Sequence, residues 1–215
     1  VTVVEGLSGE FAVSSEEAIA MSKGILDTAR TLGISVDNAT ALAGVLRTTV
    51  GLGDKQAKTF MLQTAALADS VGIAPGIVTS DMADSAEEIA SFMHDGGENI
   101  AHAAVRARQL GISLADAATI AETLLDFQSS IEAEMEASMM IGRQLNFQRA
   151  RELALAGDLS GMMDAVLDQL GGEAEFNRMN VLQRKSVADA LGVSVAQMSK
   201  LASRAGKTTE ELMRM

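Results

Sequence analysis

Apolar residues recur along this chain at the spacing of an α-helix. In the stretch 159–170, Leu159, Met162, Met163, Val166 and Leu167 follow at steps of three and one, which places them on one helix face. The same spacing predicts helices at 15–31, 36–49, 54–70, 85–94, 98–109, 147–156, 180–191 and 195–204. No stretch alternates for long enough to predict a strand. The pattern therefore predicts an all-α fold with at least seven helices and no sheet.

The longest predicted helix runs from Leu114 to about Ile141. Its apolar stripe consists of Ile120, Leu124, Phe127, Ile131 and Met135. At about 1.5 Å per residue, this helix would extend for about 40 Å and form the spine of the segment.

A short phrase recurs between the predicted helices. Its four copies are Leu32-Gly33-Ile34-Ser35, Val71-Gly72-Ile73-Ala74-Pro75, Leu110-Gly111-Ile112-Ser113 and Leu191-Gly192-Val193-Ser194. The glycines lie 39, 39 and 81 residues apart. These separations fit one, one and two periods of about 40 residues, which is a length typical of helical repeats.

Each phrase is typical of a short connection between two helices. Glycine adopts the left-handed conformation that ends one helix, the next apolar residue packs back, and serine caps the following helix. In the second phrase, Pro75 supplies the backbone angle of a first helical turn. The predicted structural turn residues are Gly33, Ser35, Gly72, Pro75, Gly111, Ser113, Gly192 and Ser194. The sequence thus predicts an array of short antiparallel helices with one long central helix, joined by Gly-Ile/Val-Ser turns.

No Gly, Pro or Ser-rich linker marks a domain boundary, so residues 1–215 are predicted to form a single helical segment. If the segment subdivides, the boundary is predicted near residue 112, between helical repeats in 1–112 and the long helix with basic C-terminal helices in 113–215. The chain begins without Met and inside an apolar pattern. We therefore expect it to be part of a longer protein.

The composition supports helices and removes several kinds of chemistry. The chain has thirteen Met and six Phe but no Trp or Tyr, which favours helices over strands. It has no Cys, so disulfides and thiolate metal sites are excluded. No apolar run approaches the length of a membrane-spanning helix, and no membrane association is predicted.

The net charge of −12 is unevenly distributed. Residues 1–177 hold 10 Lys and Arg against 26 Asp and Glu, a balance of −16, whereas residues 178–215 hold 7 against 3, a balance of +4. The acidic part repels nucleic acid phosphates. Specific nucleic acid binding is therefore not expected for most of the chain.

No catalytic residue, cofactor site or metal site is predicted, and the chain is not expected to be an enzyme. His94, Glu98 and His102 have the spacing of metal ligands on one helix, but Gly96 and Gly97 interrupt that helix. The cluster Glu132, Glu134 and Glu136 is interpreted as a solvated helix face. No nucleophile elbow or phosphate-binding loop is present.

The basic end permits an alternative function. Residues 186–201 have the helix, glycine turn and second helix of a DNA-binding helix-turn-helix, and Lys200 and Arg204 are the expected DNA contacts under that alternative. However, the same turn also occurs in the acidic part, where it encodes helix pairing. A bacterial all-helical repeat adaptor is a further alternative, because it would share the periodic turn and lack chemistry.

The region from about Gly72 to Leu201 resembles the tail tape measure proteins of long-tailed bacteriophages, particularly those with contractile tails. The segments that carry the resemblance are Asp95–Ala101, Leu124–Ala137, Gly142–Asp158, Phe176–Gln183 and the last Leu-Gly-Val-Ser turn. Their order and spacing make the match more specific than any single segment.

The resemblance implies a structural tail component in the virion. Such a protein sets tail length during assembly, occupies the tail tube lumen in a few copies, contacts tube and baseplate hub proteins, and leaves during genome ejection. It implies assembly in the host cytoplasm. A length ruler needs long helices of fixed rise, whereas the glycine turns predict short ones. The segment is therefore expected to be a module that anchors the rod or assembles several copies of it.

Overall fold

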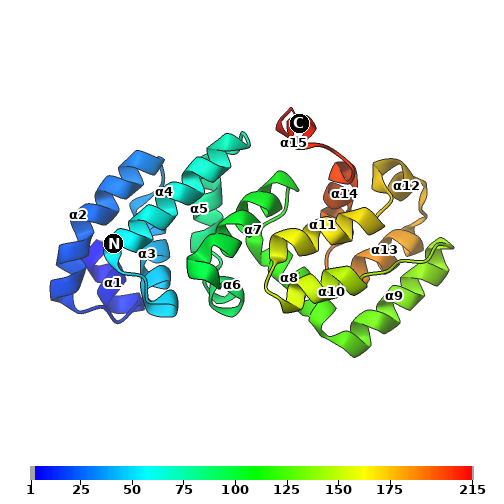
Figure 1. The fold of residues 1–215 in the computed structure, drawn as a ribbon, viewed down its shortest axis with the longest axis horizontal. Coiled ribbons are helices and arrows are strands. Elements are labelled where there is room, and N and C mark those ends of the chain that lie inside the picture. Colours follow the sequence, from blue (N-terminus) through cyan, green and yellow to red (C-terminus); the bar gives the residue numbers. More distant parts are fainter. Residues whose placement is uncertain (1–2, 215) are drawn as a thin grey trace. The chain divides into compact units, whose positions relative to one another are not determined.

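The chain folds into helices throughout the part that the structure describes. The computed structural model describes residues 3–214, in which there are fifteen α-helices, one short 3₁₀ helix and no strand (Figure 1). The helices are α1 (Val3–Glu10), α2 (Ser15–Leu32), α3 (Val36–Val50), α4 (Asp54–Ser70), α5 (Pro75–Ala83), α6 (Ala86–Phe92), η1 (Asp95–Gly97), α7 (Glu98–Gln109), α8 (Leu114–Leu125), α9 (Phe127–Ile141), α10 (Gln148–Leu155), α11 (Leu159–Gln169), α12 (Gly172–Arg178), α13 (Val181–Asp189), α14 (Val195–Arg204) and α15 (Thr209–Met213). The predicted all-α class is confirmed. Among these helices, none is both long and apolar enough to cross a membrane.

The helices predicted from apolar spacing correspond to α2, α3, α4, α6, α7, α10, α11, α13 and α14. The predicted ranges omitted α1, α5, α12 and α15, although the turn phrase had placed Pro75 at the start of a helix. These four are nine residues long or shorter, so each holds at most about two turns of apolar periodicity. The α12 helix also begins at a left-handed glycine, Gly172, directly after the left-handed Gly171, and these two glycines obscure its start.

The predicted long helix from 114 to 141 is wrong. The chain bends at Asp126, whose ψ of 78° leaves the helical range, and forms α8 and α9 in its place. The longest helix in residues 3–214 is α2, with 18 residues, which span about 27 Å. The stripe expected on one face also divides at the bend: Ile120 and Leu124 are buried, whereas Phe127, Ile131 and Met135 are exposed. Residues 3–214 therefore contain no long central helix.

The chain divides into two compact units, one up to Val105 and one from Arg106 onward. The boundary lies within α7, a few residues before the subdivision considered near 112. The first unit contains α1 to α6, and the second contains α8 to α15.

In the first unit, two helical hairpins are stacked on each other. The α2 and α3 helices form one hairpin, and α4 and α5 form the next, with α2 against α4 and α3 against α5 (Figure 1). The Asn38 side chain in α3 donates a hydrogen bond to Ser80 in α5, and Ile34 lies against Gly76. Both contacts join residues 42 positions apart, close to the 39-residue separation of the turn glycines, so similar parts of the two hairpins meet in parallel. This is the stacking of a helical repeat array, in which each hairpin buries the face of its neighbour.

In the second unit, two copies of the turn meet in an antiparallel arrangement. The turn at Gly111 lies against Arg204 at the end of α14, and the turn at Gly192 lies against Thr123 near the end of α8. Between them, Gln197 Nε2 donates to Asp116 Oδ1 at 2.5 Å. Adding 81 to 111, 116 and 123 gives 192, 197 and 204. Each of the two turns therefore contacts the same positions of the other repeat, as in a two-fold symmetric interface.

Candidate functional site

The predicted turn residues of the first unit connect its stacked helices. Gly33 is left-handed, with φ +66°, and Ser35 accepts a hydrogen bond from the Asn38 amide at 3.0 Å. Gly72 is also left-handed, with φ +75°, and Pro75 occupies the first turn of α5. These residues end one helix and begin the next.

The turns of the second unit have complete capping boxes. Ser113 and Asp116 exchange hydrogen bonds between side chain and backbone at 3.0 and 2.8 Å, and Ser194 pairs with Gln197 in the same way at 3.2 and 2.7 Å. Gly111 and Gly192 have φ values of +72° and +66°. Asp116 and Gln197, the third residues of the two boxes, are also the pair that joins α8 to α14. The same side chains therefore cap the helices and hold them together.

The two candidate DNA-contacting cations have different surroundings. Lys200 is exposed on α14. Arg204 is half-buried, its guanidinium covers the Gly111 turn, and its Nη1 donates to the Lys200 carbonyl at 3.3 Å. Of the two side chains of α13 and α14 that were expected to contact DNA, Arg204 is thus engaged in contacts within the protein.

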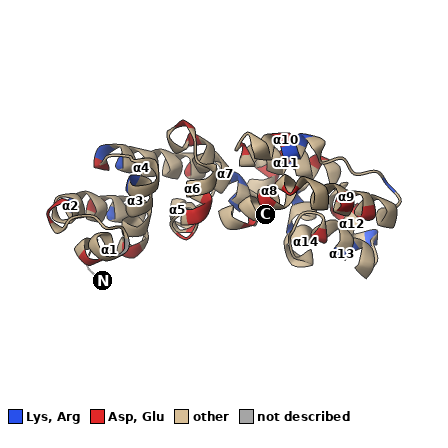
Figure 2. Cartoon of the chain, turned by 90° about the horizontal axis from the view of Figure 1, so that it is seen from below, with Lys and Arg blue, Asp and Glu red and all other residues tan. Residues whose placement is uncertain are grey.

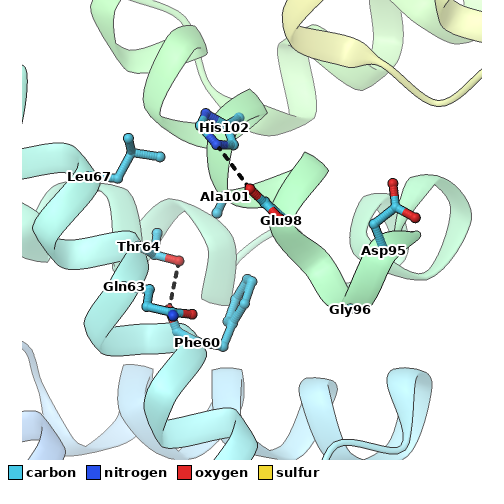
Figure 3. Close-up of a pocket in the computed structure, with 9 residues that line it drawn as sticks. All are labelled: Phe60, Gln63, Thr64, Leu67, Asp95, Gly96, Glu98, Ala101 and His102. Carbon is cyan, nitrogen blue, oxygen red and sulfur yellow. Dashed lines mark hydrogen bonds and ion pairs between the residues drawn. The ribbon is translucent and has the colours of Figure 1, made fainter.

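A pocket of about 400 Å³ lies in the first unit between α4 and the segment from η1 to α7 (Figure 3). Phe60, Leu67 and Ala101 form apolar parts of its wall, and Gln63, Asp95, Glu98 and His102 are its main polar side chains. The Thr64 hydroxyl donates to the carbonyl of Phe60 in its own helix at 2.9 Å. The residues that line the pocket thus include no nucleophile paired with a base, and the side chains of its two carboxylates, Asp95 and Glu98, are 77% and 79% exposed.

The three residues with metal-ligand spacing do not share one helix. The backbone breaks between α6 and α7, where Asp95, Gly96 and Gly97 all have positive φ. His94 Nδ1 lies 2.7 Å from Asp95 Oδ2, while His102 Nε2 lies 3.9 Å from Glu98 Oε1 on α7. Among the described residues, no group of three or more His, Cys, Asp or Glu is arranged to hold a metal ion.

The interpretation of the Glu132, Glu134 and Glu136 cluster as a solvated face is wrong for Glu134. Its carboxylate pairs with Arg151 Nη2 at 2.6 Å and accepts a hydrogen bond from the Phe147 amide at 3.0 Å. The Arg151 side chain is 4% exposed, and its Nε donates to the buried Ser130 hydroxyl at 3.0 Å. This buried network ties α9 to α10.

Arg151 is the most buried charged residue that the sequence analysis missed. A signal for it was present, because Phe147, Ala150, Arg151 and Ala154 share one face at steps of three, one and three. An arginine on an apolar face predicts a buried ionic partner. The partner itself could not be found from spacing, since Glu134 lies 17 residues earlier in another helix.

The α9 helix of the second unit has an exposed apolar side. Phe127, Ile131, Met135 and Met139 follow at steps of four, with exposed fractions of 48%, 46%, 60% and 74%. Glu132 and Glu136 are exposed beside them, and α9 contains no Lys or Arg (Figure 2). Contiguous exposed apolar surface of this kind marks protein interaction sites. An interaction surface is therefore the site that this geometry supports best.

Neither the family models nor the curated proteins compared with this chain include a match.

Proposed function

We propose that the chain is a structural segment of a phage tail tape measure protein that acts through protein contacts and not through catalysis. The resemblance of its segments to that family supports the proposal. So does the fold, because a stacked helical array with exposed apolar helix faces is suited to assembly with other proteins.

The observation that carries the proposal is the buried network of Ser130, Glu134 and Arg151. It joins two of the segments on which the resemblance depends, Leu124–Ala137 and Gly142–Asp158, by hydrogen bonds and an ion pair. The Arg143 side chain extends this connection, since its Nη2 donates to the Gln169 carbonyl at 2.7 Å. The distinctive polar residues of these segments thus hold helices in place, which fits a structural role.

The short helices support a module and not the ruler rod itself. No helix in residues 3–214 is longer than 18 residues, so the extension of this segment does not follow a single fixed helical rise. We propose that it anchors or assembles the rod, associates with further copies of itself, and contacts tail tube and baseplate hub proteins inside the tail.

The test uses purified tails of the virus that encodes this chain. An antibody against the chain is applied to protease-treated tails that are opened afterwards, before and after DNA ejection. The antigen is expected to be protected inside intact tails and lost after ejection. Its absence from intact tails would contradict the proposal. Immobilised chain is also expected to retain tube or hub proteins in a binding assay.

A DNA-binding regulator is the second candidate, favoured by the observed helix-turn-helix of α13 and α14 with exposed Lys200. The position of Arg204 over the Gly111 turn weighs against it.

A further inference from the structure

The exposed face of α9 has the dimensions of a helix docking site. Its four apolar residues, from Phe127 to Met139, extend over 13 residues, and the 12 steps between the first and the last correspond to about 18 Å along the helix. The charges of α9 itself beside this stripe are the carboxylates of Glu132 and Glu136. The face is therefore apolar and acidic.

A second exposed stripe lies on α2 in the first unit. Ile19 and Leu26 are 62% and 45% exposed, and the exposed cations Lys23 and Arg30 alternate with them at steps of four, three and four. This spacing places all four on one face, away from the buried side of the helix. Among the side chains that the structure describes, neither Lys23 nor Arg30 has an ion-pair partner. The centre of this face is apolar and basic, with Glu16 and Asp27 at its edge.

The charges decide which faces can pair. Contact between the α9 faces of two copies would bring glutamates together, and contact between two α2 faces would bring together Lys23 and Arg30. Like charges at an interface disfavour it. Contact between an α2 face and an α9 face covers both apolar stripes and places cations beside carboxylates.

We propose that the α2 face of one copy of this chain docks on the α9 face of another copy. Since two different surfaces meet, the contact is head-to-tail, and repetition gives a ring or an open chain of copies. The inference rests on the self-association in the proposed function and identifies its surfaces. Two single-helix faces form a small interface, so the association is expected to be weak, concentration-dependent and reduced by salt.

Charge reversal tests the proposal with the full chain. The first variant carries Glu132→Lys and Glu136→Lys, and the second carries Lys23→Glu and Arg30→Glu. All four side chains are exposed, so the fold should persist, which circular dichroism checks. Sedimentation velocity then measures association of each protein over a range of concentrations at low salt. A variant with Asp84→Lys and Glu87→Lys, both exposed in the first unit, is the matched charge control.

The unmodified chain and the control should associate, and each face variant alone should be monomeric. An equimolar mixture of the two face variants, and one chain carrying all four substitutions, should associate again. A monomeric unmodified chain at every concentration would overturn the proposal. So would normal association of the Lys23→Glu/Arg30→Glu variant alone, which would mean that α2 takes no part.

The same proteins separate this inference from the proposed function. If copies associate through other surfaces while the chain still binds tube or hub proteins, the inference fails and the function stands. If charge-dependent association is found but the antigen is absent from tails, the function fails and the interface stands.

Discussion

At the residue scale, two glycines inside neighbouring helices are expected to respond oppositely to the same substitution. A Cβ atom at Gly24 in α2 would meet no atom within 4 Å, so Gly24→Ala should stabilise the protein by about 0.5 to 1 kcal/mol through helix propensity. A Cβ atom at Gly44 in α3 would overlap the Phe11 ring, so Gly44→Ala should destabilise it by about 1 to 3 kcal/mol. Urea denaturation measures both. Equal effects would contradict the close approach of Phe11 to α3.

The turn glycines provide a second residue-scale prediction. Gly33, Gly111 and Gly192 have similar positive φ values, so an Ala at each carries a similar strain of about 1 kcal/mol. Gly192→Ala should cost more than Gly33→Ala, because its Cβ atom would overlap Thr123, whereas the Cβ atom at Gly33 would meet nothing within 4 Å.

Gly111→Ala should lie nearer to Gly33→Ala, since the flexible end of Arg204 can move away. Gly111→Val should destabilise the fold by about 1 kcal/mol or more, because a β-branched residue is strained in the left-handed conformation. Melting temperatures rank the variants. No change for Gly111→Val would contradict the observed turn.

The local sequence could predict these turns but not the distant residues that pack against them. Glycine before an apolar residue and serine is a local signal, since the left-handed backbone and the cap involve adjacent residues. The contacts of Gly111 with Arg204 and of Gly192 with Thr123 join distant parts of the chain. Repetition of the phrase predicted four similar helix connections, but it did not predict that the turns at Gly111 and Gly192 pack against each other.

At the element scale, the link between α9 and α10 is expected to depend on the Arg151 ion pair. Arg151→Met should destabilise the protein by about 3 kcal/mol, because it leaves the largely buried Glu134 carboxylate without its cation. Arg149→Met is the matched control: its side chain is 71% exposed and pairs with Glu152 at 3.6 Å, so the effect should stay within about 0.5 kcal/mol. Equal losses would contradict the burial of the network.

The cap of α15 gives a pH-dependent prediction. The Thr208 backbone amide and hydroxyl donate to Glu211, and the backbone hydrogen bond is the main cause that lowers the pKa of this carboxyl. A lowered pKa in the folded state means that the cap is present above the ordinary glutamate range and is lost as pH falls through the lowered value. The Thr208 amide signal in NMR should follow this titration. In Glu211→Gln that titration should disappear.

The wrong prediction of one long helix over 114–141 shows which information apolar periodicity does not contain. An apolar stripe continues from Ile120 to Met135 in the sequence, but periodicity does not reveal whether a face is covered by protein or by solvent. The bend at Asp126 involves a residue whose helix propensity is only about 0.7 kcal/mol or less below that of alanine. Packing of α8 and α9 against different neighbouring helices is sufficient to outweigh such a small preference and to bend the chain at Asp126.

At the scale of the whole molecule, the sequence predicted the helical class because its composition and periodicity agree along the whole chain. It did not predict that one turn phrase serves two arrangements, parallel stacking in the first unit and antiparallel pairing in the second. Both arrangements bury the same kind of apolar helix face. The choice between them depends on distant contacts such as Asn38 with Ser80 and Asp116 with Gln197.

The last prediction concerns the choice between protein and DNA as the partner. Residues 1–177 carry a balance of −16 and repel phosphate, while Arg204 is placed over the Gly111 turn and leaves Lys200 as the exposed cation of the pair. Duplex DNA is therefore expected to bind only weakly at low salt, with little sequence preference, and to dissociate at physiological salt. Fluorescence anisotropy with a pool of random duplexes measures this weak binding.

The Lys200→Ala variant should reduce the weak binding slightly, whereas Arg204→Ala should lower the melting temperature by removing the contact with the turn. A specific affinity of about 10 nM or tighter at physiological salt, lost in Lys200→Ala while the fold persists, would replace the structural role with that of a DNA-binding regulator.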